Sequence, residues 1–291
     1  MSYNTIDSVF VRQYADVYEA LCEQKESKLL STIKNIGSVT GSSFTVNIMS
    51  SLGDDFGTPT RFGETQYSEA GFASRLAVMN DFSNFTKFAL TDLPKLKADP
   101  QDELLQRLHA KRNRKIDSII YNALLGTAQE KTTLADTYTG IALPASQIVG
   151  DGTAPLTKQQ LIDVKTKFMD NDVEGETIYL VYNSDVVNAI LNDNQLTSND
   201  YLNVKLLQNG DITDFLGFRW IPYNGIKAKD ATVATGVAYV SSALQFGANQ
   251  ISPLKMAELE SENRTQSLGE ITSYGAIRTD EKKVVAFKFA V

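Results

Sequence analysis

The chain has very little of two residue types that build many functional sites. Among its 291 residues there is one cysteine, Cys22, and one histidine, His109. One cysteine cannot form an intrachain disulfide, so nothing points to an oxidising compartment. One histidine excludes histidine-rich metal sites and leaves a single candidate for a catalytic triad. We interpret His109 instead as a partly exposed polar residue within a helix.

Long apolar segments and excess positive charge are also missing. No apolar run approaches the about 18 residues that a membrane span requires, and residues 1–8 lack the pattern of a signal peptide. The 28 basic and 35 acidic residues give a net charge of −7, so no general electrostatic attraction to nucleic acid is expected. A surface that merely faces nucleic acid remains compatible with this charge. We expect a protein made in the cytoplasm, without a membrane partner.

Motifs that bind phosphates or activate a nucleophile are absent from the sequence. There is no P-loop, no G-x-G-x-x-G and no G-x-S-x-G. Residues 170–175 begin like a calcium loop, but the twelfth position, where a glutamate is required, is Val181, so they are interpreted as a helix-to-strand turn. We predict no cofactor, no metal and no enzymatic activity. A hydrolase that uses carboxylates such as Asp170 and Asp172 is the alternative from another class.

The clearest element is a long helix over residues 100–125. Asp99 suits the N-cap, Pro100 suits the first helical position, and acidic residues follow at the positive end of the helix dipole. Apolar residues then recur every three or four positions, and Gly126 is expected to end the helix in a left-handed conformation. The pattern predicts one helix of about 26 residues, roughly 39 Å long.

Two segments before this helix alternate apolar and polar residues, which predicts the strands of a long hairpin. They are residues 44–49 and 72–79, and the turn-rich stretch between them carries large apolar residues. An isolated two-stranded ribbon is marginal in water, and the chain offers no obvious partner for it. The hairpin is therefore expected to need a partner surface.

The remaining segments predict an α+β fold. One amphipathic helix, or two, is predicted over residues 7–33, with Cys22 on the apolar face as a small core residue. After a polar connection over residues 129–155, a capping box at Thr157 and Gln160 begins one helix, and Ser184 caps another. Strands are predicted at 177–182, 215–222 and 233–241 and over most of 256–291. Helices and antiparallel strands thus occupy separate blocks of the chain.

The candidate functional residues lie on the long helix and the hairpin. The helix carries five basic residues within positions 107–115, which form either a solvated face or a docking strip for acidic residues of a partner chain. The hairpin supplies such acids, including Glu69. The predicted assembly contacts are Asp54, Asp55, Phe56, Arg61, Phe62, Glu64, Arg107, Lys111 and Arg114. Phe82, Phe85 and Phe88 are interpreted as core residues rather than as a stacking platform for bases.

The order of these elements resembles the major capsid proteins of tailed bacteriophages, of the Hong Kong 97 type. Several local phrases are similar as well. Residues 115–120 resemble the second half of the family's spine helix, and residues 182–185 resemble its strand-to-helix step. Residues 216–218 resemble a leucine-glycine phrase that precedes an axial-domain strand, and residues 275–278 resemble the closing strands.

The resemblance implies a division of the chain into five segments. They are an N-terminal arm (1–37), an extended hairpin loop and return (38–98), a spine helix with a peripheral-domain connection (99–156), an axial domain (157–241) and closing strands of the peripheral domain (242–291).

The function implied by the resemblance is structural. Subunits of this family self-assemble through pentamers and hexamers into an icosahedral shell that encloses double-stranded DNA without reading its sequence. The shell is assembled in the host cytoplasm and becomes the virion capsid, and separate scaffold, portal and decoration proteins are compatible with it. An encapsulin-like compartment that holds enzymes is the alternative within the same fold.

Overall fold

The computed structural model describes residues 22–50, 52, 61–64, 67–89, 101–132, 137–173, 175–192, 214–226 and 232–290. The chain divides into two compact units. Unit 1 comprises Met1–Glu26, Phe82–Arg114 and Ile251–Thr272, and unit 2 comprises Ser27–Asp81, Lys115–Gln250 and Ser273–Val291. Residues 7–21 of the predicted N-terminal helix and most of the hairpin tip (residues 52–66) lie outside the described residues.

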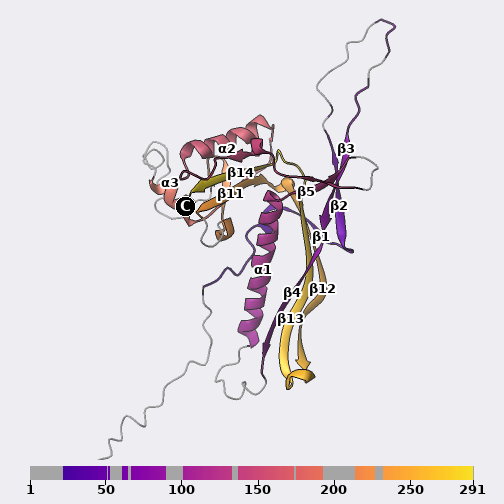
Figure 1. Cartoon of the computed structure of the whole chain (residues 1–291), viewed down its shortest axis with the longest axis vertical. Helices are drawn as coiled ribbons and strands as arrows, with labels where there is room; N and C mark the ends of the chain where they lie inside the picture. Colours follow the sequence, from indigo (N-terminus) through magenta and orange to yellow (C-terminus); the bar gives the residue numbers. More distant parts are fainter. Residues whose placement is uncertain are drawn as a thin grey trace, which may run out of the picture. The chain divides into compact units, whose positions relative to one another are not determined.

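The predicted long helix is confirmed as α1, Gln101–Leu125 (Figure 1). Its apolar stripe is buried at Leu108, Ile116, Ile120 and Leu124. The expected left-handed conformation at Gly126 is wrong, because Gly126 is absent from the described glycines with positive φ. Glycine is needed there for space: a Cβ at Gly126 would lie 2.8 Å from the Asn122 carbonyl oxygen, which accepts the hydrogen bond of the Gly126 N–H.

A six-stranded sheet forms the core of unit 2, in the order β7-β14-β11-β8-β10-β9. Strands β8 and β10 pair in parallel, as do β7 and β14, whereas β11 is antiparallel to both β8 and β14. The α+β class is confirmed, but the strands are not all antiparallel as expected. The bounds are β7 Ile148–Val149, β8 Ile178–Tyr182, β9 Asp214–Phe215, β10 Phe218–Pro222, β11 Val233–Val240 and β14 Val284–Ala290.

Two shorter helices accompany this sheet. Helix α2, Lys158–Asp170, packs against β14 and β7, and Figure 1 shows it beside β14. Its predicted capping box at Thr157 and Gln160 is confirmed. Helix α3, Ser184–Asn192, begins one residue earlier than expected, because the side chain of Asn183 rather than Ser184 accepts the hydrogen bond from the Val186 N–H. The turn after α2 is confirmed as a turn between a helix and a strand.

The hairpin strands are confirmed as β2, Ser43–Met49, and β3, Phe72–Val78, paired antiparallel with Ser43 opposite Val78 and Met49 opposite Phe72. The expectation that the chain offers this hairpin no partner is wrong. Strand β5, Ala128–Lys131, pairs with β3, and β6, Thr139–Ile141, pairs with β5, which completes a four-stranded sheet. Both strands lie in the predicted polar connection, where short strands give little local signal.

The third sheet has the order β1-β12-β13-β4. Its long strands begin earlier than predicted, since β12 already starts at Leu244. The bounds are β1 Lys34–Ser38, β4 Asn80–Phe88, β12 Leu244–Leu259 and β13 Thr265–Arg278. The 3-10 helices are η1 Leu30–Thr32, η3 Ala145–Gln147, η4 Asn224–Ile226, η5 Ser241–Ala243 and η6 Glu260–Glu262.

The described end of the predicted N-terminal helix is not an α-helix. Within unit 2, the buried Asp117 carboxylate of α1 accepts hydrogen bonds from Ser27 Oγ at 2.6 Å, Lys28 N at 3.0 Å and Leu29 N at 3.1 Å. These bonds hold consecutive residues in a turn and use donors that a continuous helix would direct along its own axis. Cys22, expected in the core, is exposed.

Unit 1 contains the three phenylalanines of β4. Phe82 and Phe88 are half-buried, in line with core packing, but Phe85 is 51% exposed, so the core interpretation is wrong for Phe85. Its ring lies directly against Gly269, where an added Cβ would come within 2.1 Å of the ring. In the part of the chain that the structure describes, no helix is long and apolar enough to cross a membrane.

Candidate assembly site

The hairpin residues predicted as assembly contacts are exposed where the structure describes them. Arg61, Phe62 and Glu64 are all exposed, and the Phe62 side chain is 94% accessible. The Arg61 guanidinium lies 5.1 Å from the centre of the Phe62 ring, within the range of a cation–π contact. Asp54, Asp55 and Phe56 lie outside the described residues.

The outer face of the hairpin continues this apolar exposure. Met49 and Phe72 are directly opposite each other in the register and are 66% and 71% exposed. Val78 lies on the same face, and it is exposed as well. Leu52 and Tyr67, at the two ends of the tip, are also exposed. Exposed apolar groups of this number within one small element are typical of an interface.

The helix residues predicted as assembly contacts have carboxylate partners within unit 1. Arg107 lies 3.3 Å from Glu103 and 3.6 Å from Glu23, and Arg114 lies 2.5 Å from the same Glu23 carboxylate. The hydrogen bond from Arg114 lowers the pKa of Glu23, despite the opposing effect of burial. Lys111 is exposed.

Glu23 was not predicted as a site residue, because the helix predicted over its segment implies no ion pair with α1. Arg112, another member of the basic run, lies 3.1 Å from the buried Glu270. Within unit 1, several of the basic residues therefore bind to their own chain. Whether others also contact a neighbouring subunit stays a prediction.

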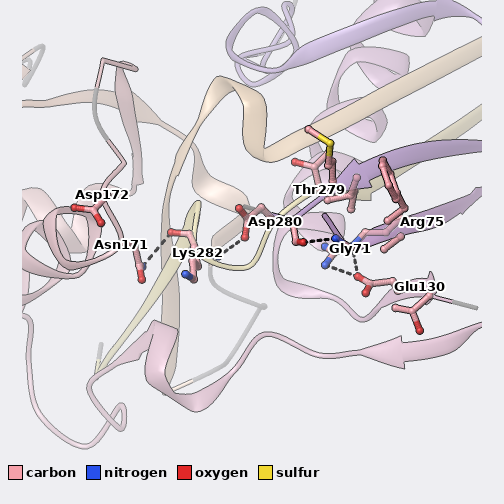
Figure 2. Close-up of a pocket in the computed structure, with 14 residues that line it drawn as sticks. Gly71, Arg75, Glu130, Asn171, Asp172, Thr279, Asp280 and Lys282 are labelled. Atoms are coloured by element: carbon pink, nitrogen blue, oxygen red, sulfur yellow. Dashed lines mark hydrogen bonds and ion pairs between the residues drawn. The ribbon is translucent and has the colours of Figure 1, made fainter. Parts of the chain in front are cut away.

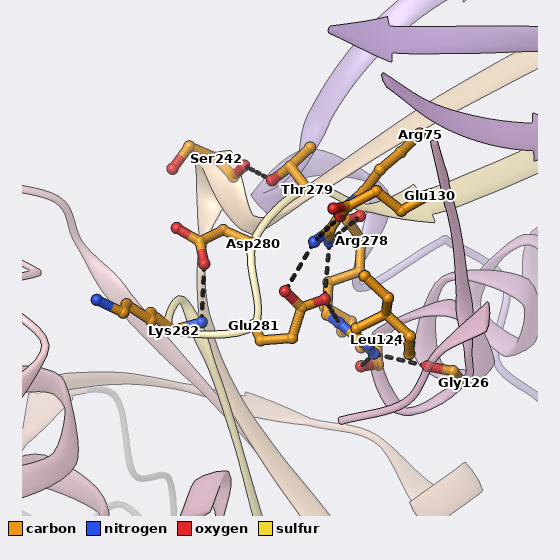
Figure 3. A network of polar contacts seen from close by, with 11 residues as sticks. Arg75, Leu124, Gly126, Glu130, Ser242, Arg278, Thr279, Asp280, Glu281 and Lys282 are labelled. Carbon is orange, nitrogen blue, oxygen red and sulfur yellow. Dashed lines mark hydrogen bonds and ion pairs between the residues drawn. The ribbon is translucent and has the colours of Figure 1, made fainter. Parts of the chain in front are cut away.

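A buried ion network ties the hairpin to the rest of unit 2. The Arg75 guanidinium, on β3, donates to both oxygens of Glu281 at 2.8 and 2.7 Å and to Glu130 of β5 at 2.7 Å (Figure 3). It also donates to the Arg278 carbonyl oxygen at 3.0 Å. Burial favours the neutral form of Glu281, but Arg75 and Arg278 outweigh it, so the pKa of Glu281 lies below its ordinary value.

Arg278 extends the same network to the end of α1. Its guanidinium donates to the carbonyl oxygens of Leu124 at 2.9 Å, Gly126 at 2.6 Å and Ile141 at 3.0 Å (Figure 3). Two of these oxygens lie at the C-terminus of α1, where carbonyl groups lack intrahelical partners and the dipole favours a cation. The hairpin, the helix end and the β13–β14 turn are thus joined through two arginines and Glu281.

This network was not predicted from the sequence. Alternation in β3 places Arg75 on the same face as Ala73 and Ala77, the latter buried in a small core with Val46 and Ala128. A single arginine on an otherwise apolar strand face is the signal that could have identified a buried ion pair.

A pocket of about 800 Å³ lies next to Arg75, between the distal half of the hairpin and two turns of unit 2. Figure 2 shows Lys282 beside Asn171 and Asp172 at one side of the pocket and Thr279 beside Arg75 and Glu130 at the other, with Asp280 between them. The Asn171 amide donates to the Lys282 carbonyl oxygen at 3.2 Å. Among the described residues, no group of three or more histidine, cysteine, aspartate or glutamate side chains is placed to hold a metal ion.

Comparisons with known proteins agree with this geometry. A family model described as phage capsid protein matches residues 6–291. No curated protein matches the chain. Among solved structures, one from Mycobacterium phage Che8 is similar with a TM-score of 0.73 and 13% identity, over 98% of this chain and 98% of that chain. One from Mycobacterium phage Ogopogo has a TM-score of 0.71 and 15% identity, over 100% and 99% of the two chains. A structure of the capsid of a native GTA particle has a TM-score of 0.70 and 12% identity, over 100% and 99%.

The structural similarities show a shared fold over the whole chain, and the family model shows the family. The predicted Hong Kong 97-type fold is thereby confirmed. Of the alternatives that the sequence left open, the family supports neither the carboxylate hydrolase nor the enzyme-holding compartment. The chain belongs to the phage capsid protein family and is a structural, non-enzymatic component of the virion capsid.

Proposed function

We propose that this capsid protein assembles through pentamers and hexamers into a closed icosahedral shell around double-stranded DNA. The exposed apolar residues of the hairpin carry the proposal, because their burial on a neighbouring subunit would remove a large apolar area from water. The similar GTA capsid was computed with C5 symmetry, which is the symmetry of an icosahedral vertex.

The charge of the chain supports a wall that encloses DNA without gripping it. A net charge of −7 gives no general attraction to phosphates, so no sequence-specific or tight binding is proposed. Separate scaffold, portal and decoration proteins are further partners that this assembly would accommodate.

We propose that the hairpin is the main assembly device. Phe62 and the Met49–Phe72 pair would fill apolar contacts on the neighbouring subunit, and Glu64 would face the exposed Lys111. Each such exposed ion pair contributes at most about 1 kcal/mol. Repetition around a shell makes even a weak contact decisive, because each added subunit is held at several sites.

Replacement of residues 52–66 by Asn-Gly tests the hairpin as an assembly device. Loop length enters stability only logarithmically, so the variant should fold and melt like the wild type. It should form no closed shells in negative-stain images. Normal shells from this variant would contradict the proposal, and loss of folding would show that the tip belongs to the subunit core.

A charge swap tests the proposed partner of Glu64. Glu64→Lys and Lys111→Glu each place like charges together and should lower the yield of shells, whereas the double variant should restore it. Asp170→Lys, at the exposed end of α2, is the control for a change of charge alone. Equal yields from both single variants and the double variant would exclude this contact but leave the hairpin's apolar role open to the tip replacement.

A further inference from the structure

Strand β2 leaves one of its two edges open. β2 is the terminal strand of its sheet, with β3 on one side and no strand among the described residues on the other. The Met79 N–H donates to the Ser42 carbonyl oxygen, and the Ser50 N–H donates to that of Gly71. Because antiparallel pairing alternates, the even-numbered residues of β2 bond to β3. The backbone groups of Ser43, Thr45, Asn47 and Met49 therefore point to the open edge.

Every other sheet edge in the described residues carries a feature that discourages strand addition. Strands β6, β7 and β9 have only three, two and two residues. Strand β1 has a register shift between Asn35 and Gly37. The longer edges carry charges or proline: β4 has Asp81 and Lys87, and the part of β12 beyond its pairing with β1 has Pro253, Lys255 and Glu258. Short length, bulges, charge and proline are the usual means of protecting an edge.

Strand β2 has none of these features. Its seven residues, Ser43–Met49, include no charged residue and no proline, and its register with β3 has no shift. A soluble protein that leaves such an edge open exposes unpaired N–H and C=O groups to any extended chain. The contrast with the other edges indicates that the edge of β2 is available for hydrogen bonding to an added strand.

We propose that β2 receives an added strand from a second copy of this chain, so that the hairpin sheet continues across the subunit boundary. This inference rests on the proposed function, since a shell brings copies of one chain together at high local concentration. An added strand would bond to the outward backbone groups of Ser43, Thr45, Asn47 and Met49. Its alternate side chains would cover Phe44 and Ile48, which are only half-buried beside the buried Val46.

Hydrogen exchange of the pure chain tests the proposal without any substitution. In the unassembled subunit, the amides of Thr45, Asn47 and Met49 should exchange rapidly, whereas those of Val46 and Ile48 should be protected by β3. In assembled particles the first group should slow by on the order of 100-fold, while the second changes little. Because this chain is the only protein present and the unassembled subunit lacks the protection, protection that appears with assembly indicates a strand from a second copy.

A pair of substitutions at Asn47 separates backbone from side chain. Asn47→Pro removes an outward N–H at an edge position that tolerates proline, and Asn47→Ala removes the side chain but keeps the N–H. Both should melt like the wild type, and only Asn47→Pro should lose closed particles. Particles whose outward amides exchange as fast as in the subunit, or normal particles from Asn47→Pro, would overturn strand addition alone. A wild-type chain that stays monomeric would overturn the proposed function with it.

Discussion

Substitution of Arg75 by leucine should destabilise the subunit more than any surface change. The Arg75 side chain is 5% exposed and binds the carboxylates of Glu130 and Glu281. Leucine would leave Glu130 and Glu281 partly buried and without the cation that they share, with Arg278 Nε still 3.3 Å from Glu281. Breaking a buried ion pair by removal of one partner costs about 3–5 kcal/mol.

The expected change in melting temperature follows from this free energy. At about 2–4 °C per kcal/mol for chains of this size, Arg75→Leu should lower Tm by about 6–20 °C. The single tryptophan, Trp220, is buried in the six-stranded sheet, so its fluorescence reports unfolding of unit 2. Tm should be measured in dilute solution, where neither the wild type nor Arg75→Leu is assembled, because assembly would stabilise the wild type.

Two controls separate the ion network from loss of arginine as such. Lys283→Ala breaks the partly exposed Lys283–Glu176 pair, which lies in unit 2 like Trp220, and should cost at most about 1 kcal/mol. Adding Glu130→Gln and Glu281→Gln to Arg75→Leu removes the unpaired charges and should recover part of the lost stability. A Tm for Arg75→Leu within about 2 °C of the wild type would refute the reasoning, because it would correspond to a cost of at most about 1 kcal/mol.

Three further predictions concern the same fold. The pKa of Glu281 is lowered in the folded protein, so ionised Glu281 stabilises the fold above the unfolded value of 4.5, and this stabilisation is lost as the pH falls through the folded value. In urea titrations below pH 4.5, the free energy of unfolding should therefore depend less steeply on pH in Glu281→Gln than in the wild type. Ile120→Asp should bury an unpaired charge and abolish cooperative melting, whereas the free energy of unfolding of His109→Ala should stay within about 0.5 kcal/mol of the wild type. If the two variants melt alike, the buried and exposed faces of α1 are misassigned. Asp117→Ala should speed exchange of the Leu29 amide, and unchanged exchange would mean that the Asp117 carboxylate does not hold this turn.

Local periodicity explains what the sequence predicted well. The three-and-four spacing of α1 and the alternation of β2 and β3 are consequences of one segment burying one face, so they can be seen without knowledge of partners. Strands β5 and β6 were missed because four and three residues carry little pattern, and their pairing with the hairpin depends on distant parts of the chain. The segment at Ser27 was predicted as helical because the binding of Asp117 is equally non-local.

The candidate assembly residues also fall into two groups: properties that the local sequence predicts, and contacts that depend on the fold. Exposure of Phe62 and Glu64 followed from a turn-rich stretch with aromatic residues, which is a local property. The pairing of Arg107 and Arg114 with Glu23 did not, because Glu23 is far away in the sequence and only the fold brings it to α1. Ion pairs between distant segments are decided by tertiary packing, so the sequence showed the charges and not their partners.

A cryo-electron microscopy map of particles formed by the purified chain would show whether the hairpin joins subunits into a shell. We expect closed shells with fivefold vertices, in which the hairpin lies on a neighbouring subunit that covers Phe62, Met49 and Phe72. Particles in which these three side chains face solvent, or a chain that forms no shell under any condition of salt and concentration, would contradict this expectation.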